Sequence, residues 1–212
     1  MAELLNKEIS SLFTRLILLI GLTFTLSMIL FGGSFSFWNS AFSDLGSTIT
    51  PDGISNYSSC IIFMIGMVIS GIIFFMIGWL FLKNKNIVHH RLKFTFSLMG
   101  SLGCFIFIFP HNINNNIHMI GAALFVAAVW ALGTLFLIES RKIGERERTV
   151  ILQTILQSTV ISYAISYFAD LSIKNIAQKF AVFGLIIVLK SVTSFRTIFE
   201  WRKIAVFNSK YK

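Results

Sequence analysis

Six long apolar stretches, separated by short polar segments, set the pattern of this chain. Each is close to the ~20 residues that a helix needs to cross about 30 Å of hydrocarbon, and none alternates as a membrane-spanning strand does. The pattern therefore predicts an all-α, polytopic integral membrane protein, with one transmembrane domain over residues 1–212. The expected spans are 12–31, 59–82, 92–109, 117–138, 149–168 and 176–199.

A short amphipathic segment precedes the first span. Its apolar residues Leu4, Leu5, Ile9 and Leu12 recur at helical spacing, opposite polar residues that include Lys7. This spacing predicts a separate amphipathic N-terminal helix that lies on the inner leaflet. The first span itself is too long for the apolar core of a signal peptide, so we expect it to remain in the membrane.

The basic residues predict the orientation of the bundle. Of the 18 Lys and Arg residues, all but Lys174, Lys179 and Lys190 fall on one set of alternate connections or at the two ends of the chain. Because basic connections face the cell interior, we expect a cell-membrane protein with cytoplasmic N- and C-termini. One of these connections carries a cluster that we expect to be solvated against anionic headgroups: Lys83, Lys85, His89, His90, Arg91 and Lys93.

Composition supports the same class of protein. A soluble domain of this length carries about a quarter charged residues, whereas this chain is 13% charged and 55% hydrophobic. A net charge of +9 would suggest a nucleic-acid partner for a soluble protein, but here the basic residues flank the spans, so membrane lipids are the expected partners. Cys60 and Cys104 lie in apolar stretches and predict small buried side chains. No metal site or cofactor is indicated.

Small residues at four-residue spacing mark the expected helix contacts, because helices in lipid associate by close approach. We expect four such stripes to face the bundle, with the Phe and Ile residues outward, and possible homo-oligomers would also use these faces. The stripes are Ala123, Ala127 and Ala131; Ser158, Ser162 and Ser166; Gly66 and Ser70; and Ser97 and Ser101. Gln153 and Gln157 predict an interhelical hydrogen-bonded clasp. Lys190 either lines a pathway or extends to the inner interface.

The outer connections hold the candidate chemistry. In the first, apolar residues at helical spacing predict a short helix that ends at Gly46, where Asp44 bonds nearby backbone amides. The next outer connection carries His111, and His118 follows in the first turn of the fourth span. The last outer connection carries Asp170.

Two hypotheses compete for these four residues. Two imidazoles and two carboxylates, Asp44, His111, His118 and Asp170, are the right types for a zinc-hydroxide hydrolase if they converge at the outer mouth. However, no pair has the spacing of a helical zinc motif. The simpler interpretation is that Asp44 caps a turn and that His118 bonds a neighbouring loop, which would hold the outer ends together.

Two motifs resemble a known group of membrane proteins. SDLG at 43–46 follows the first span and is itself followed by Pro51, and HMIGA at 118–122 opens the fourth span after Phe-Pro at 109–110. These motifs resemble the Frag/DRAM/Sfk family and the related prokaryotic domain-of-unknown-function family nine-nine-eight, over most of the chain. The resemblance implies about six helices, with Asp44 and His118 as the shared polar residues. The asparagine-rich run at 112–116 departs from the pattern.

What the resemblance implies about function is limited. The prokaryotic branch has no established activity, and the eukaryotic relatives are associated with lysosomal, autophagic or plasma-membrane lipid roles. Three functions therefore stand in this order: a non-enzymatic protein that binds lipid or organises the membrane, a membrane-embedded hydrolase acting on lipid at the outer headgroup level, and a small transporter or channel. The last requires a polar path past Gln153, Gln157 or Lys190.

Overall fold

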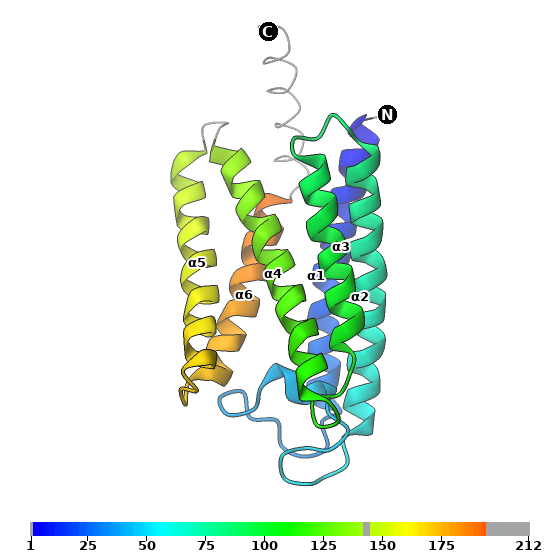
Figure 1. Cartoon of the computed structure of the whole chain (residues 1–212), viewed down its shortest axis with the longest axis vertical. Coiled ribbons are helices and arrows are strands. Elements are labelled where there is room, and N and C mark those ends of the chain that lie inside the picture. Colours follow the sequence, from blue (N-terminus) through cyan, green and yellow to red (C-terminus); the bar gives the residue numbers. More distant parts are fainter. Residues whose placement is uncertain (1, 142–144, 194–212) are drawn as a thin grey trace, which may run out of the picture.

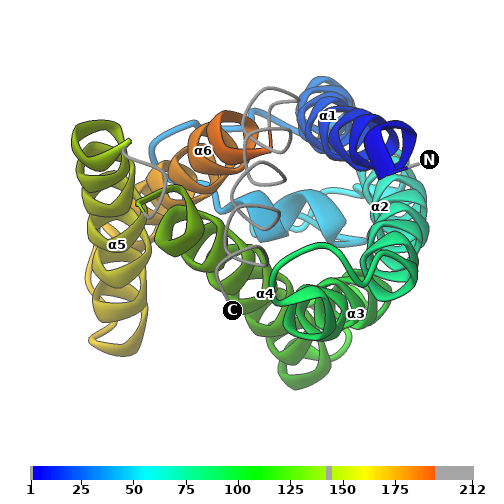
Figure 2. The ribbon, with the colours of Figure 1, turned by 90° about the horizontal axis from the view of Figure 1, so that it is seen from above.

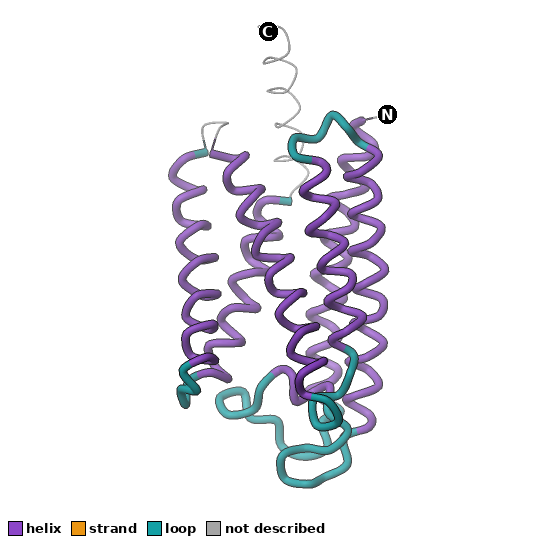
Figure 3. The backbone as a smooth tube through the Cα atoms, in the orientation of Figure 1, coloured by secondary structure: helices purple, strands orange, loops and turns teal. Residues whose placement is uncertain are grey.

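A computed structural model of the chain describes residues 2–141 and 145–193, and these residues form a bundle of helices (Figure 1). Figure 3 shows the helices joined by loops. Within the described ranges, the only extended pairing is an isolated antiparallel bridge between Ile49 and Ser55. The helices are α1 (Ala2–Ile29), the 3-10 helix η1 (Phe42–Gly46), α2 (Tyr57–Lys83), α3 (His90–Phe107), α4 (Asn115–Arg141), α5 (Arg146–Phe168) and α6 (Lys174–Val192).

The bundle is that of an integral membrane protein. Among the described residues, five helices are long and apolar enough to cross a membrane, namely α1, α2, α4, α5 and α6. The remaining long helix, α3, opens with Arg91 and Lys93, which lower its hydropathy, but it runs beside α2 and α4 (Figure 1). The predicted all-α membrane bundle is confirmed. The end of the sixth predicted span, beyond residue 193, lies outside the described residues.

The predicted separate N-terminal helix is wrong. α1 runs without a break from Ala2 to Ile29, so the amphipathic segment and the first span are one helix. Ile9, Leu12 and Phe13 are buried in the bundle core. Their helical spacing therefore reflects packing against other helices and not a surface that lies flat on lipid.

The two ends of the bundle differ. The basic end carries the start of α1, the α2–α3 connection, the end of α4 and the start of α5 (Figure 1). The loop end carries the long α1–α2 connection with η1 and the α3–α4 and α5–α6 connections. Seen from above, α1, α2, α3, α4 and α6 surround the segment that holds η1, whereas α5 lies to one side and packs mainly on α6 (Figure 2). The loop end is therefore closed by a folded segment.

Phenylalanine forms much of the core, which corrects the expectation that these side chains face lipid. Phe13, Phe81 and Phe136 pack ring against ring, as do Phe63 and Phe107 with ring centroids 5.3 Å apart. Lipid tails are as apolar as these side chains. Polarity therefore does not decide whether a phenylalanine faces the lipid or the interior of the bundle. Shape and ring contacts decide the position instead.

The small-residue stripes divide into two groups. Gly66, Ser70, Ser97 and Ser101 are buried between α2, α3 and their neighbours, which confirms those two predicted faces. The other two stripes point outward over most of their length, so the prediction that they face the bundle is wrong. Ala123 and Ala127 on α4 and Ser158 and Ser162 on α5 are all exposed. The homo-oligomer expected through such faces stays a prediction.

Close packing of α3 and α4 uses a different stripe. An added Cβ at Gly121 would lie 2.3 Å from the Phe107 backbone nitrogen, and one at Gly103 would lie 2.5 Å from that of Phe125. These distances are too short for any side chain, so both glycines are required for the two backbones to meet. A four-residue spacing of small residues does not by itself show which face of a helix contacts a neighbour. Here the contact face is identified by the glycines that lie against the backbone of the other helix.

At the basic end, one residue of the predicted solvated cluster is fully buried. The Lys93 ammonium donates to the Glu139 carboxylate at 2.7 Å and lies 4.8 Å from the centre of the Phe136 ring. The other Glu139 oxygen contacts His89 Nδ1 at 3.0 Å. For Lys93 the prediction of a solvated position is wrong, because a buried carboxylate and aromatic faces replace its water.

Candidate functional site

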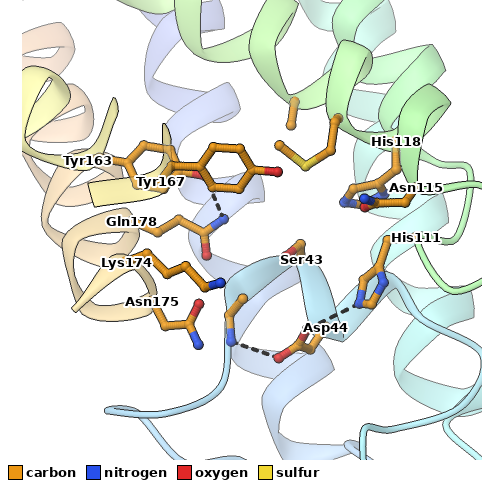
Figure 4. A pocket seen from close by; sticks show the side chains of 13 residues that line it. Ser43, Asp44, His111, Asn115, His118, Tyr163, Tyr167, Lys174, Asn175 and Gln178 are labelled. Carbon is orange, nitrogen blue, oxygen red and sulfur yellow. Dashed lines mark hydrogen bonds and ion pairs between the residues drawn. The ribbon is translucent and has the colours of Figure 1, made fainter. Parts of the chain in front are cut away.

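A polar cavity of about 160 Å³ opens at the loop end, between α4, α5, α6 and η1 (Figure 4). It brings together side chains that are far apart in the sequence. The polar residues that line it are Ser43, Asp44, His111, Asn115, His118, Tyr163, Tyr167, Lys174, Asn175 and Gln178. We call this cavity the loop-end pocket. It contains three of the four residues that the sequence singled out.

Asp44 has the capping role that the sequence predicted. It lies in η1, where its Oδ2 accepts a hydrogen bond from the Ala41 amide at 2.7 Å. Its Oδ1 is 3.2 Å from His111 Nε2 (Figure 4), so that nitrogen carries the hydrogen and donates it to the carboxylate. The carboxylate thereby joins the α1–α2 and α3–α4 connections.

His118 also makes the predicted bond to a neighbouring loop. Its Nδ1 lies 2.7 Å from the Phe109 carbonyl oxygen, and because a carbonyl only accepts, Nδ1 carries the hydrogen. The ring packs on Phe107 with centroids 4.5 Å apart. The contact of Gly121 with the Phe107 backbone fixes α4 against α3, and so holds this hydrogen bond in place.

The second nitrogen of His118 is the chemically open group of the pocket. The side chain is fully buried, and its Nε2 has no hydrogen-bond partner in the described ranges of the chain. Since Nδ1 holds the hydrogen, the neutral ring leaves Nε2 with an accepting lone pair. We call this atom the open nitrogen. Buried polar atoms are nearly always satisfied, so one that is not indicates a place for a ligand or water.

The opposite wall comes from α5 and α6 and was not found from the sequence. Gln178 accepts a hydrogen bond from the Phe42 amide at 2.8 Å and donates to the Tyr163 hydroxyl at 3.4 Å. Asn175 donates to the Asn39 carbonyl. These contacts attach α6 to the segment that closes the loop end. Nothing in the local sequence signals them, since they join residues 136 positions apart.

A buried lysine reinforces this attachment. Lys179 on α6 is fully buried, and its ammonium donates to the Ser40 and Asn175 carbonyl oxygens. The rings of Phe37 and Phe42 lie 5.3 and 5.4 Å from the nitrogen. Carbonyl oxygens and ring faces thus replace the hydration of the charge. Lys179 holds the loop segment and does not line the pocket.

Asn56 organises the rest of the loop end. Its buried side chain accepts a hydrogen bond from the Gly32 amide at 2.9 Å and donates to the carbonyls of Asp44 and Ser47 at 3.2 and 2.8 Å. The sequence Asn56-Tyr57-Ser58 also reads as a glycosylation signal. With its amide buried and bonded, Asn56 holds the segment that carries Asp44 in place.

Asp170 does not join the other three candidates. It is exposed at the start of the α5–α6 connection and forms an ion pair with Lys174 one turn later. Asp44, His111 and His118 do meet, and the two imidazole rings are 5.7 Å apart. Across residues 2–141 and 145–193, no group of three His, Cys, Asp or Glu side chains is placed to hold a metal ion. The zinc-hydrolase hypothesis therefore lacks the ligand set that it requires.

The polar residues proposed for a transport path make other contacts. The Trp130 indole donates to Gln157 at 3.0 Å, and Gln157 donates to Thr134 at 3.4 Å, which confirms the predicted clasp for this glutamine. Gln153 lines an open groove of about 580 Å³ between α4 and α5. Lys190, in the last turn of α6, donates to the Thr14 hydroxyl at 3.0 Å.

Comparison with known proteins adds no assignment, since no family model, curated protein or solved structure matches this chain. The resemblance to the Frag/DRAM/Sfk family and to the related prokaryotic family therefore stays a prediction. The class of the protein, a helical integral membrane protein with a polar pocket at one end, comes from the fold and the geometry alone.

Proposed function

We propose that this protein binds a membrane lipid without transforming it and holds the lipid headgroup in the loop-end pocket. The observation that carries the proposal is the open nitrogen of His118, a buried acceptor that faces a cavity lined by polar side chains (Figure 4). A cavity of about 160 Å³ has the volume of about five water molecules. That volume suits a small polar headgroup and not a folded chain or a large cofactor.

The helix surfaces next to the pocket support an amphiphilic ligand. On α4, His118 and Ala122 line the pocket, and Phe125 and Val129 continue the same face towards the middle of the bundle. On α6, Gln178 is followed on its face by Val182 and by further apolar residues. These later residues border an apolar cleft of about 20 Å³, which their side chains nearly fill. Polar and apolar surfaces therefore follow one another in the order of a headgroup and its chain, and a chain that enters the cleft must displace these side chains.

The charge distribution supports an orientation for this site. The basic end carries most of the Lys and Arg residues, so the positive-inside rule places it at the cytoplasm. Both termini then lie in the cytoplasm and the loop-end pocket lies at the headgroup level of the opposite leaflet. The proposed location is the cell membrane.

A hydrolase that acts on the same headgroup is the second candidate. Its support is the pairing of Asp44 with His111 beside the open nitrogen, since an accepting imidazole is the group that a general base requires. This candidate predicts that lipid incubated with the protein is cleaved. Simple binding predicts that the same lipid is recovered intact.

Lipid binding is tested by filling the pocket with a larger side chain. Ala122 lines the cavity, whereas its neighbour Ala123 is exposed on the outer face of α4, so Ala122→Leu and Ala123→Leu are a matched pair. Native mass spectrometry of the detergent-purified protein should show lipid retained by the wild type and by Ala123→Leu, and lost from Ala122→Leu. Equal retention by both variants would overturn the proposal. If Ala122→Leu does not fold, Tyr167→Phe, which removes one hydroxyl at the pocket, should weaken retention severalfold.

A further inference from the structure

We infer that the headgroup taken by the loop-end pocket has a phosphate at one end and a hydrogen-bond donor at the other, an ammonium or hydroxyl group and not a trimethylammonium. This inference rests on the proposed lipid binding and goes further, because it names the chemistry that the pocket selects. It follows from which polar atoms on each wall are already used within the protein and which remain for a ligand.

The α4 wall offers acceptors. The open nitrogen of His118 can only accept, because the Phe109 carbonyl fixes the hydrogen on Nδ1. Protonating it would create a buried cation packed against Phe107, which is costly. Asp44 stands beside it, and a carboxylate with one bond on each oxygen retains further lone pairs. A ligand atom that bonds to the open nitrogen must therefore carry hydrogen.

The α5–α6 wall offers donors. Gln178 already uses its amide on Phe42 and Tyr163. The Lys174 ammonium gives one of its three hydrogens to Asp170, so its other two and the hydroxyl hydrogens of Tyr163 and Tyr167 remain for a ligand (Figure 4). An ammonium and phenols together suit a phosphate oxygen. Among the lining residues, the Asp44 carboxylate and the Lys174 ammonium, which also contacts Asp170 outside the pocket, lie on facing walls and complement a dipolar headgroup.

A trimethylammonium group fits this arrangement poorly. It has no N–H, so it would bury the open nitrogen of His118 against methyl groups and leave it without a donor. Leaving a buried acceptor unsatisfied is unfavourable. We therefore expect the pocket to prefer an ethanolamine or glycerol headgroup to a choline headgroup by about tenfold, the ratio that 1.4 kcal/mol represents.

The experiment is a competition measured by native mass spectrometry on the full chain. Short-chain phosphatidylethanolamine and phosphatidylcholine with identical tails are offered together, and the ratio of the two complexes is counted. In His118→Asn the side-chain amide can still donate to the Phe109 carbonyl, but the acceptor at the position of Nε2 is gone. His90→Asn makes the same change at the basic end and is the control.

The wild type and His90→Asn should favour the ethanolamine lipid about tenfold, and His118→Asn should bind both lipids equally. Equal binding of both lipids by the wild type, or a preference that survives in His118→Asn, would overturn the inference. His118→Gln, which places an amide near Nε2, should restore part of the preference even if His118→Asn folds poorly.

A second arm separates this inference from lipid binding itself. Glycerophosphoethanolamine and glycerophosphocholine, which lack acyl chains, are offered in the same assay. If the deacylated ethanolamine compound binds selectively while no intact lipid is retained, the headgroup chemistry stands and the proposed lipid function fails. If intact lipid is retained in an Ala122-dependent manner without any headgroup preference, the lipid function stands and this inference fails.

Discussion

The two ends of the bundle each combine a histidine, a carboxylate and a buried lysine, but they use them differently. At the basic end, Lys93 and His89 both contact Glu139, so the two carboxylate oxygens each meet a basic side chain. At the loop end, Asp44 is bonded to His111 and to a backbone amide, while the neighbouring His118 keeps its open nitrogen. The first arrangement is closed within the protein, and the second is completed only by something from outside.

This contrast distinguishes polar residues that stabilise the fold from polar residues that are available to bind a ligand. A buried polar network that satisfies its own members fixes helices in place, and its loss costs stability. A buried polar atom that the fold leaves open adds nothing to stability and can reduce it, but it contributes to binding.

Lys93→Met should be the most destabilising change. It leaves the Glu139 carboxylate buried with only His89 as a basic partner, and breaking a buried pair costs about 3–5 kcal/mol. Equilibrium unfolding in detergent measures the loss. The double variant Lys93→Met with Glu139→Leu should recover most of it, because no charge is then left unpaired. Equal losses in the single and double variants would show that packing and not charge sets the effect.

Asn56→Ala should cost about 1–3 kcal/mol, since it removes a buried amide that bonds Gly32, Asp44 and Ser47. The Gly32 amide loses its acceptor, so its hydrogen exchange should become much faster. Asn114→Ala, which removes a single exposed bond to the Ile117 amide, is the matched control. Unchanged exchange at Gly32 in Asn56→Ala would show that the Asn56 side chain does not hold this segment in place.

His118→Asn should lower the free energy of unfolding by less than about 1 kcal/mol. Its amide replaces the one hydrogen bond that His118 makes, the bond to the Phe109 carbonyl, and the open nitrogen had none to lose. The same unfolding assay, in lipid-free detergent, provides the comparison with Lys93→Met. A loss as large as that of Lys93→Met would mean that the pocket is also a structural network.

Asp170→Asn should have no measurable effect on the unfolding temperature. Lys174 holds the pKa of the Asp170 carboxyl below its usual range, through a hydrogen bond and its charge. A lowered carboxyl pKa means that the pair acts above the ordinary pKa and is lost as pH falls through the lowered one. Because the pair is exposed, water screens it. A clear shift at neutral pH would show that Asp170 belongs to a network.

The sequence predicted the bundle well because length and hydropathy are local properties. The prediction failed where a stripe of small residues could face either the bundle or the outside. Ala123 and Ala127 have the spacing of a contact face, yet they point outward, and Gly121 makes the contact instead. Lys93 was assigned to water because it is charged and near a helix end. Its burial depends on Glu139, 46 positions later.

One half of the candidate site was predicted from the sequence. Asp44, His111 and His118 stood out as polar residues beside long apolar stretches, and the structure places them together. The opposite wall could not be found, because Tyr163 and Gln178 look like ordinary residues of α5 and α6. Their role appears only when the folded loop segment brings Phe42 against α6.

The most direct test is an experimental structure of the protein purified with native lipid in place. We expect a headgroup in the loop-end pocket, with a hydrogen-bearing atom at hydrogen-bond distance from His118 Nε2 and a phosphate near Lys174. Lipids found only around the outside of the helices, with His118 Nε2 bonded to another part of the protein, would contradict it.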